Sequence, residues 1–209
     1  VPLIIEKVYK SKLKPIIDRN KMIMSLPIID KVIQKKILKE LTAAFGGNFY
    51  EVIIGGAAFN PEVEAFFKKI GFPLTVGYGM TECAPIITYA DWKEARLTSC
   101  GREVMNMKVR IDSSDPENIP GEIQVSGPNV FLGYYKNEQA TAEVTTDDGW
   151  FRTGDMGIID KDGFLYIRGR SKCMILGPSG QNIYPEEIEA VVNNVNYVVD
   201  SLVIEDNGN

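Results

Sequence analysis

The stretch DGWFRTGDMGIIDKDGFLYIRGRSKCMI, residues 148–175, carries the strongest fold signals in this 209-residue chain. Its two Asp-Gly pairs, Asp148-Gly149 and Asp162-Gly163, are flanked by apolar and aromatic residues, a pattern typical of β-hairpin turns. Between the turns, Thr153-Gly154-Asp155 is a bend of small residues that presents one carboxylate. The stretch therefore predicts a hairpin whose first strand carries an acidic side chain.

A basic side chain follows the second turn. Residues 164–168 are predicted to form a strand that ends in Gly169-Arg170-Ser171-Lys172. The carboxylate of Asp155 and the guanidinium of Arg170 could together bind a polyhydroxylated ligand such as a ribose. The alternative is a surface hairpin closed by an ion pair, and this stretch by itself leaves both open.

Upstream of the hairpin, residues 1–45 are predicted to be helical, with breaks at Pro15 and Pro27. From Ile28 onward the apolar residues recur mostly at three- and four-residue steps, and Gly46-Gly47 ends the pattern. We expect a scaffold helix that packs on a sheet. An amphipathic helix that binds a partner is the alternative.

Residues 49–79 alternate between strand, glycine and helix signals. The predicted strands, 49–54 and 73–76, flank a predicted helix at 61–70. The strands end in two glycine clusters, Gly55-Gly56-Ala57 and Gly77-Tyr78-Gly79. This order predicts parallel strands whose carboxyl ends coincide, and open α/β sheets bind ligands at that edge. Both clusters thus indicate one site, with two tight turns as the alternative.

From about Leu97 the pattern changes to short strands separated by turn residues, at 104–112, 121–127 and 150–160. They predict a small β subdomain, either barrel-like or a folded sheet. Later signals, namely a strand at 174–176, a glycine loop, a helix at 185–193 and a strand at 197–204, predict the start of an α+β unit. The expected fold class is α/β plus β, in units 1–96, 97–169, 170–172 and 173–209.

Composition excludes several chemistries. The chain contains no histidine, which rules out a histidine-based triad, a histidine general base and a His-ligated zinc site within it. A net charge of −5 argues against a nucleic-acid partner. The three cysteines are widely spaced and predicted to be reduced. Any catalysis therefore rests on carboxylates, cations, backbone dipoles or a metal held by oxygen.

The segment YGMTE, residues 78–82, follows the second predicted parallel strand and suits phosphate chemistry. A phosphate site needs hydroxyl or amide donors, and magnesium prefers hard oxygen ligands such as carboxylates. Thr81 and Glu82 supply one group of each kind. A helix cap is the alternative explanation for this pair.

Three motifs follow one another in the chain: YGMTE, the 148–175 hairpin and GPSGQNIYPEEIE at 177–189. In this order and at these distances the chain resembles the adenylate-forming enzymes, which include acyl-CoA synthetases, luciferases and peptide-synthetase adenylation domains. Among them it is most similar to bacterial long-chain fatty acid–CoA ligases. The resemblance covers about residues 1–205. It implies that 1–96 ends a large α/β adenylate-binding domain and that 173–209 begin a small C-terminal domain.

The resemblance also implies a role for each motif residue. Thr81 and Glu82 are expected to be catalytic, with Thr81 on the phosphate and Glu82 on Mg²⁺. Asp155 and Arg170 are expected to bind the ribose, and Lys172 to be the hinge about which the C-terminal domain rotates. Further contacts with the ligands are expected around the adenine (Gly55, Gly56, Ala57, Gly77, Tyr78 and Gly79) and in the thioester-forming loop (Gly177 and Gly180).

The implied reaction activates a fatty acid with Mg²⁺ and ATP through an acyl-AMP intermediate and then transfers the acyl group to coenzyme A. The expected location is the cytoplasm, with any peripheral membrane association left to segments outside this chain. The family's Ser/Thr/Gly-rich phosphate loop and its C-terminal lysine are missing from these residues, so we expect a fragment that is inactive alone. The alternatives are an adenylating enzyme for another acid and a non-catalytic nucleotide- or acyl-binding module.

Overall fold

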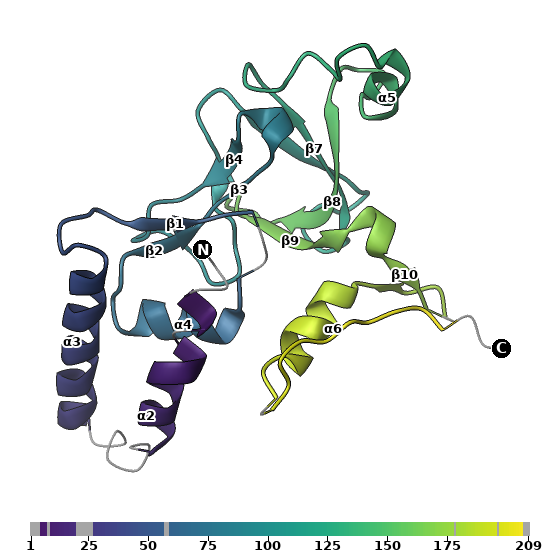
Figure 1. The fold of residues 1–209 in the computed structure, drawn as a ribbon. Coiled ribbons are helices and arrows are strands. Elements are labelled where there is room, and N and C mark those ends of the chain that lie inside the picture. The colour runs from purple at the N-terminus through teal and green to yellow at the C-terminus, as the bar shows by residue number, and fades with distance from the viewer. Residues whose placement is uncertain are drawn as a thin grey trace.

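The computed structural model describes residues 5–7, 9–19, 27–56, 59–177, 179–195 and 197–206. Figure 1 shows helices and a parallel pair of strands in the first third, antiparallel strands in the middle, and a small C-terminal part on the other side of the molecule from α3. Within the described ranges, no helix has the length and apolar character needed to cross a membrane.

The N-terminal segment is helical wherever it is described, as the sequence predicts. Its elements are a π-helical turn, η1, and two α-helices (η1 Tyr9–Leu13, α2 Lys14–Arg19 and α3 Pro27–Ala44). Two glycines end α3: Gly46 N donates to Ala43 O and Gly47 N to Thr42 O, both with positive φ. Ile37 of α3 is buried in the core, and Ile33, Leu38 and Leu41 pack partly buried against it, so one face of the helix meets the body of the protein.

The predicted βαβ unit forms with the predicted parallel pairing. Its elements are two strands and the helix between them (β1 Val52–Ile54, α4 Pro61–Lys69 and β2 Leu74–Val76). Val52 pairs with Leu74 and Ile54 with Val76 in parallel register, so both strands end at the same edge. Asn60 Oδ1 caps α4 by accepting hydrogen bonds from the backbone N–H groups of residues 62 and 63.

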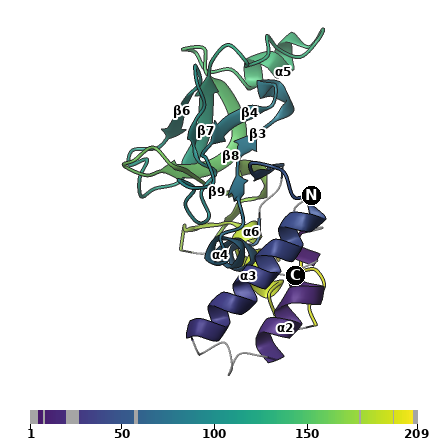
Figure 2. The same ribbon diagram turned by 90° about the vertical axis from the view of Figure 1, so that its left-hand side faces the viewer.

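The middle of the chain forms two antiparallel sheets. The smaller has the order β3-β4-β5 and the larger the order β6-β7-β8-β9. Their bounds are β3 Tyr78–Gly79, β4 Ile86–Tyr89, β5 Arg102–Glu103, β6 Lys108–Asp112, β7 Gly121–Ser126, β8 Phe151–Ile159 and β9 Leu165–Arg170. In Figure 2 these strands lie above the helices α2, α3 and α4, and the short helix α5 (Glu138–Glu143) projects at the top.

The two antiparallel sheets are open, so the barrel-like form of the β subdomain is not confirmed. Backbone hydrogen bonds join them at one place: Cys100 N donates to Leu165 O, and Leu165 N donates to Gly101 O. The described strands form no closed ring of pairing, because β5 is two residues long and pairs only with β4 as a strand. The alternative of a folded sheet describes this region better.

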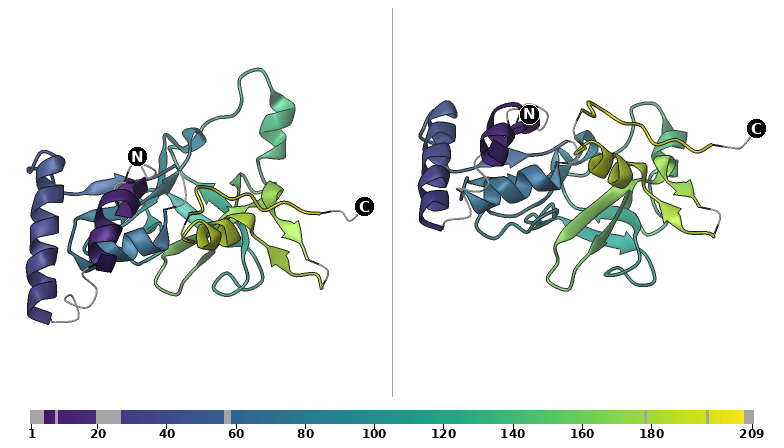
Figure 3. Two further views of the ribbon diagram at one scale, coloured as in Figure 1. Left: turned by 60° about the horizontal axis from the view of Figure 1, so that its bottom comes forward. Right: turned by 90° about the horizontal axis from the view of Figure 1, so that it is seen from below.

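The C-terminal part begins at the short turn η3 (Ser171–Cys173) and contains one hairpin and one helix (β10 Ile175–Leu176, β11 Asn182–Ile183 and α6 Pro185–Val192). Figure 3 shows α2 and α4 between α3 and α6. The strand predicted at 197–204 is wrong, because described residues 197–206 contain no strand. The backbone N–H of Val203 donates to the Glu189 carboxylate instead of to a neighbouring strand.

Candidate functional site

The carboxyl ends of β1 and β2 bring the two glycine clusters together. Gly77 N donates to Ile54 O at 2.8 Å, and a Cβ on Gly55 would lie 3.4 Å from Gly77 O. A Cβ on Gly77 would lie 3.2 Å from Thr88 O, tighter than an ordinary contact. The predicted juxtaposition of Gly55 and Gly77 is therefore present, with Gly77 buried against Thr88 and Ile86 and with Gly55 and Gly56 exposed. Ala57 lies outside the described residues.

Tyr78 connects this edge to the hairpin. Its hydroxyl donates to Asp155 Oδ2 at 2.6 Å, and both side chains are buried. Burial first, and then the neighbouring Asp155 carboxylate, raise the pKa of Tyr78 well above its ordinary value. The phenol therefore stays protonated and donates a hydrogen bond to the carboxylate at any physiological pH.

Asp155 lies on the buried face of β8, because successive side chains of a strand point to opposite faces of the sheet. Phe151, Thr153 and Asp155 share the buried face of the strand, and Thr153 Oγ1 accepts from Asp155 N while donating to Ile123 O. The predicted turn at Asp162-Gly163 closes the hairpin, since Asp160 N donates to Phe164 O and Gly163 has a φ of +82°. The local sequence thus folds so that this carboxylate faces inward.

Arg170 faces Asp155 across the hairpin. The two residues are direct partners in the antiparallel register of β8 and β9, and Arg170 Nε lies 3.2 Å from Asp155 Oδ1. The side chain of Arg170 is 68% exposed and that of Asp155 is 10% exposed. The ion pair considered for this hairpin therefore exists, but its carboxylate is buried beside Tyr78, which follows the carboxyl end of β2.

Thr81 and Glu82 lie on a 3₁₀ turn, η2 (Thr81–Cys83), directly after β3. The residue at the N-cap position is Met80, and no side chain caps the turn, so the helix-cap alternative for this pair is wrong. Thr81 is exposed and Glu82 is partly buried. Burial raises the pKa of Cys83 to about 11, so the neighbouring thiol remains protonated at neutral pH and is a poor nucleophile.

A segment that the sequence did not single out holds this turn in place. We call residues 129–134 the strap. Asn129 Nδ2 donates to Cys83 O at 2.8 Å and to Ile86 O at 2.9 Å, and Phe131 N donates to Glu82 O at 2.8 Å. Tyr134 completes the contact through its hydroxyl, which donates to Glu82 Oε1 at 3.2 Å. The only sequence signal was the turn-forming and aromatic character of GPNVFLGYY at 127–135.

The donor chemistry of this turn is compatible with magnesium bound together with a nucleotide. The described residues contain no group of three or more His, Cys, Asp or Glu side chains that could hold a metal by themselves. Magnesium usually takes only one or two protein carboxylates and completes its shell with phosphates and water. Glu82 would be that protein ligand, and Thr81 would offer a hydroxyl to the phosphate.

The residues predicted for the hinge and the thioester-forming loop lie apart from this edge. Lys172 is exposed in η3, between β9 and β10. In the loop that follows, Gly177 N donates to Gln181 O and Gly180 has a φ of +80°. Figure 1 places β10 well away from β1 and β2, so the structure does not bring Gly177 or Gly180 to Tyr78.

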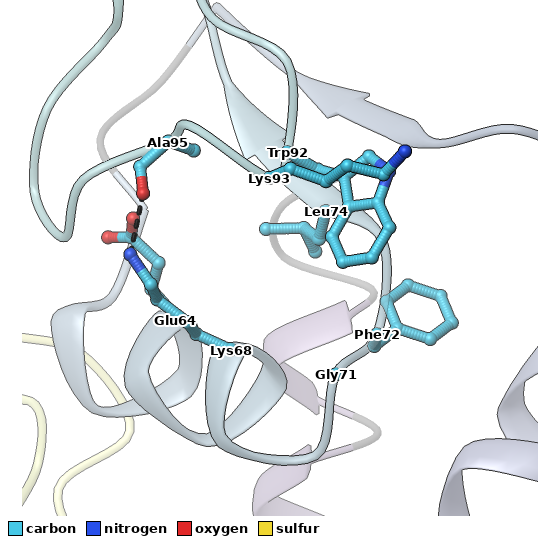
Figure 4. Close-up of a pocket in the computed structure, with 8 residues that line it drawn as sticks. All are labelled: Glu64, Lys68, Gly71, Phe72, Leu74, Trp92, Lys93 and Ala95. Atoms are coloured by element: carbon cyan, nitrogen blue, oxygen red, sulfur yellow. Dashed lines mark hydrogen bonds between the residues drawn. The ribbon is translucent and has the colours of Figure 1, made fainter.

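A cavity of about 210 Å³ lies elsewhere, between α4 and the loop after β4. Figure 4 shows Glu64, Lys68 and Ala95 on one side of it, opposite the indole of Trp92. Two of its polar side chains are engaged within the protein, since Lys68 Nζ donates to Ala95 O and Glu64 Oε2 accepts from Thr98 N. The indole Nε1 of Trp92 is buried without a hydrogen-bond partner among the described residues. None of the predicted site residues lines this cavity.

Glu64 in this cavity makes a testable contribution to stability. Burial raises the pKa of Glu64, with partial offset from the Thr98 N–H and Lys68. The pKa of Glu64 is therefore higher in the folded protein than in the unfolded protein. At pH values below the unfolded pKa, the neutral carboxyl makes its full favourable contribution to the free energy of unfolding. This contribution is lost as pH rises through the folded pKa. Glu64→Gln never ionises, so its free energy of unfolding relative to wild type should increase as pH rises from about 4 to 7.

Denaturant unfolding at a series of pH values measures this difference. Glu40→Gln on α3 is the matched control, because Glu40 is exposed and has no hydrogen bond or ion pair with another described residue. A Glu64→Gln profile parallel to that of Glu40→Gln across this pH range would show that burial does not perturb Glu64.

The chain is similar in sequence to known enzymes. Residues 18–135 match the family model described as AMP-binding enzyme. A long-chain-fatty-acid–CoA ligase of Mycobacterium bovis is 36% identical over 158 residues, which cover 76% of this chain and 25% of the relative. A 2-succinylbenzoate–CoA ligase of Bacillus cytotoxicus is 39% identical over 168 residues, covering 75% of this chain and 34% of the relative.

Solved structures show the same fold. O-succinylbenzoate coenzyme A synthetase of Bacillus subtilis, in complex with AMP, superposes with a TM-score of 0.69 at 28% identity and covers 83% of this chain and 38% of that one. Another structure of that enzyme, with ATP and magnesium, has a TM-score of 0.68 at 29% identity, covering 81% and 38% of the two chains.

These matches define the class as adenylate-forming enzymes with mixed α/β sheets. The chain belongs to the AMP-binding enzyme family. The relatives it matches are acyl-CoA ligases, of whose length it spans roughly a quarter to two fifths.

Proposed function

We propose that this chain is part of an acid–thiol ligase that uses ATP to activate a carboxylic acid as an acyl-AMP and then transfers the acyl group to coenzyme A. The observation that carries the proposal is the hydrogen bond from Tyr78 to Asp155, two motif residues 77 positions apart. It joins the edge of the parallel strands to a hairpin whose Arg170 completes a diol-binding pair. Thr81 and Glu82 follow directly on the same edge.

Different residues bind different parts of the nucleotide. Asp155 accepts hydrogen bonds from the ribose hydroxyls, and Arg170 has the freedom to turn toward them because most of its side chain is exposed. Gly55 and Gly56, both exposed, let the adenine approach the backbone, and the Tyr78 ring borders it. Catalysis by such a site is mostly positioning and charge stabilisation.

Thr81 and Glu82 act on the phosphates in this proposal. Thr81 donates its hydroxyl to a non-bridging oxygen, and Glu82 is the carboxylate that would hold Mg²⁺. The metal supplies positive charge that offsets the negative charge of the phosphates. The strap keeps the backbone of the turn fixed, so that neither side chain depends on a flexible loop.

The acid substrate that we propose is a long-chain fatty acid. Support comes from the mycobacterial relative and from a second long-chain-fatty-acid–CoA ligase, of Gallus gallus, which is 34% identical over 168 residues and covers 80% of this chain. The 2-succinylbenzoate–CoA ligases are similarly close, so an aromatic dicarboxylic acid is the competing substrate. Coenzyme A would meet the loop that contains Gly177 and Gly180.

The test is substrate profiling of the intact protein that contains this chain. Pyrophosphate release and thioester formation are measured with fatty acids of graded length and with 2-succinylbenzoate, at equal concentrations with ATP, Mg²⁺ and coenzyme A. We expect turnover within about 1–10³ per second for a long-chain acid and at least tenfold less for 2-succinylbenzoate. The reverse order would overturn the choice of acid. Nucleotide binding without turnover on any acid would favour a non-catalytic binding module.

A further inference from the structure

Tyr134 differs from the rest of the strap in what it contacts. Asn129 and the backbone of Phe131 bind carbonyl oxygens and thereby fix the backbone of the turn. Tyr134 instead donates its hydroxyl to Oε1 of the Glu82 side chain, 52 positions earlier in the chain. One carboxylate oxygen of the expected metal ligand is therefore already held by the protein.

Tyr134 is itself anchored on two sides. Its ring packs edge-on against Phe131, with a centroid distance of 4.9 Å and an interplanar angle of 74°. Its backbone N–H donates to Thr141 Oγ1 at 2.9 Å, which ties it to α5. Phe131 in turn packs edge-on against Phe151, a buried residue at the start of β8. The hydroxyl is thus presented to Glu82 by a side chain that packs on Phe131 and whose backbone is tied to α5.

The second carboxylate oxygen of Glu82, Oε2, is available to bind a ligand. Within the described ranges, no hydrogen bond or ion pair engages Glu82 Oε2. A glutamate side chain that is partly exposed loses rotamer freedom when it binds a metal, and a hydrogen bond that already orders it removes part of that loss. Partners that orient a ligating carboxylate in this way strengthen metal binding.

We propose that Tyr134 is a positioning residue for Glu82: its hydroxyl orders the carboxylate so that the remaining oxygen binds Mg²⁺ beside the nucleotide. The inference rests on the proposed function, because Glu82 meets a metal only if the site takes a magnesium-bound nucleotide. It predicts that loss of the Tyr134 hydroxyl weakens metal binding, and that the aromatic ring without the hydroxyl is enough to keep the fold stable.

The experiment compares Tyr134→Phe with Tyr135→Phe in the intact protein. Both changes remove one hydroxyl and keep the ring, and Tyr135 is 89% exposed with no hydrogen bond to a described residue. Binding of Mn²⁺, as a magnetic substitute for Mg²⁺, is followed by electron paramagnetic resonance in the presence of a non-hydrolysable ATP analogue. Binding of the analogue without metal and the thermal midpoint are measured in parallel.

We expect Tyr134→Phe to raise the Mn²⁺ dissociation constant roughly three- to tenfold, the range of one hydrogen bond to a charged group that is partly exposed. Metal-free binding of the analogue should change less than about twofold, as should every quantity for Tyr135→Phe. In a Glu82→Ala background, Tyr134→Phe should have no further effect on Mn²⁺ binding, because the group that it orders is gone.

Equal Mn²⁺ affinities for Tyr134→Phe and Tyr135→Phe would overturn the inference and leave the proposed function standing. So would a loss for Tyr134→Phe that persists undiminished in the Glu82→Ala background, because the hydroxyl would then act through another group. A wild-type protein that binds neither the analogue nor Mn²⁺ with it would overturn the proposed function and this inference together.

Discussion

Asp155→Asn is expected to weaken ATP binding about ten- to a hundredfold, the largest effect of any single change at the site. The loss corresponds to about 1.5–3 kcal/mol, the usual worth of a hydrogen bond to a charged group. Asparagine retains an oxygen that accepts the Tyr78 hydroxyl, so the buried phenol keeps a partner. It removes the negative charge and leaves only one acceptor where a ribose diol needs two. Calorimetric titration with a non-hydrolysable ATP analogue measures the change.

Asp162→Asn is the matched control, because it makes the same chemical change at the far end of the same hairpin. Asp162 pairs with Arg96 and its side chain is 47% exposed. Surface ion pairs of this kind contribute little to stability. We expect wild-type affinity for this control. If Asp155→Asn bound the analogue as tightly as Asp162→Asn, Asp155 would be no more than a structural partner of Tyr78.

Lys172→Pro is expected to separate the two half-reactions, with acyl-AMP formation retained and transfer to coenzyme A slowed by at least about tenfold. Proline fixes φ near −65° at its own position and restricts the residue before it, here Ser171. Lys172 lies in the short turn between β9 and β10. Restricting two consecutive residues there would hinder rotation of the C-terminal part.

Pyrophosphate release set against thioester formation, in the intact protein, gives the ratio of the two steps. Lys172→Ala is the matched control, because it removes the same side chain and leaves the backbone free. Lys172 is exposed, so we expect the control to resemble wild type in both steps. Equal slowing of both steps by Lys172→Pro, in a protein that remains folded, would contradict the assignment of the hinge.

The contacts that the structure shows around this turn explain why a rotation there would have a cost. Arg168 Nη1 lies 3.2 Å from Glu187 Oε1, and a Cβ on Gly169 would clash with the Glu186 carboxylate at 2.6 Å. At the other end of α6, Asn194 Oδ1 accepts from Asn60 Nδ2 at 2.6 Å. The C-terminal part is therefore docked on β9 and α4 through polar contacts and through the buried Tyr184 and Pro185.

Much of the fold could be predicted from sequence because the deciding interactions are local. An Asp-Gly pair with glycine at positive φ closes the β8–β9 hairpin, and period-2 alternation places Asp155 on its buried face. The antiparallel register then brings Arg170 opposite Asp155. Strand, helix and strand in short succession likewise determine the parallel pairing of β1 and β2. Each of these needs only residues that are near in the chain.

Only the tertiary structure decided which distant groups meet. The Tyr78–Asp155 hydrogen bond and the strap's contacts with Glu82 join residues about fifty to eighty positions apart. No periodicity or turn signal encodes such contacts, because they depend on how separately formed elements pack. The same reason accounts for the wrong strand at 197–204. Its residues have strand propensity, but a strand forms only against a partner edge, and the described structure provides none there.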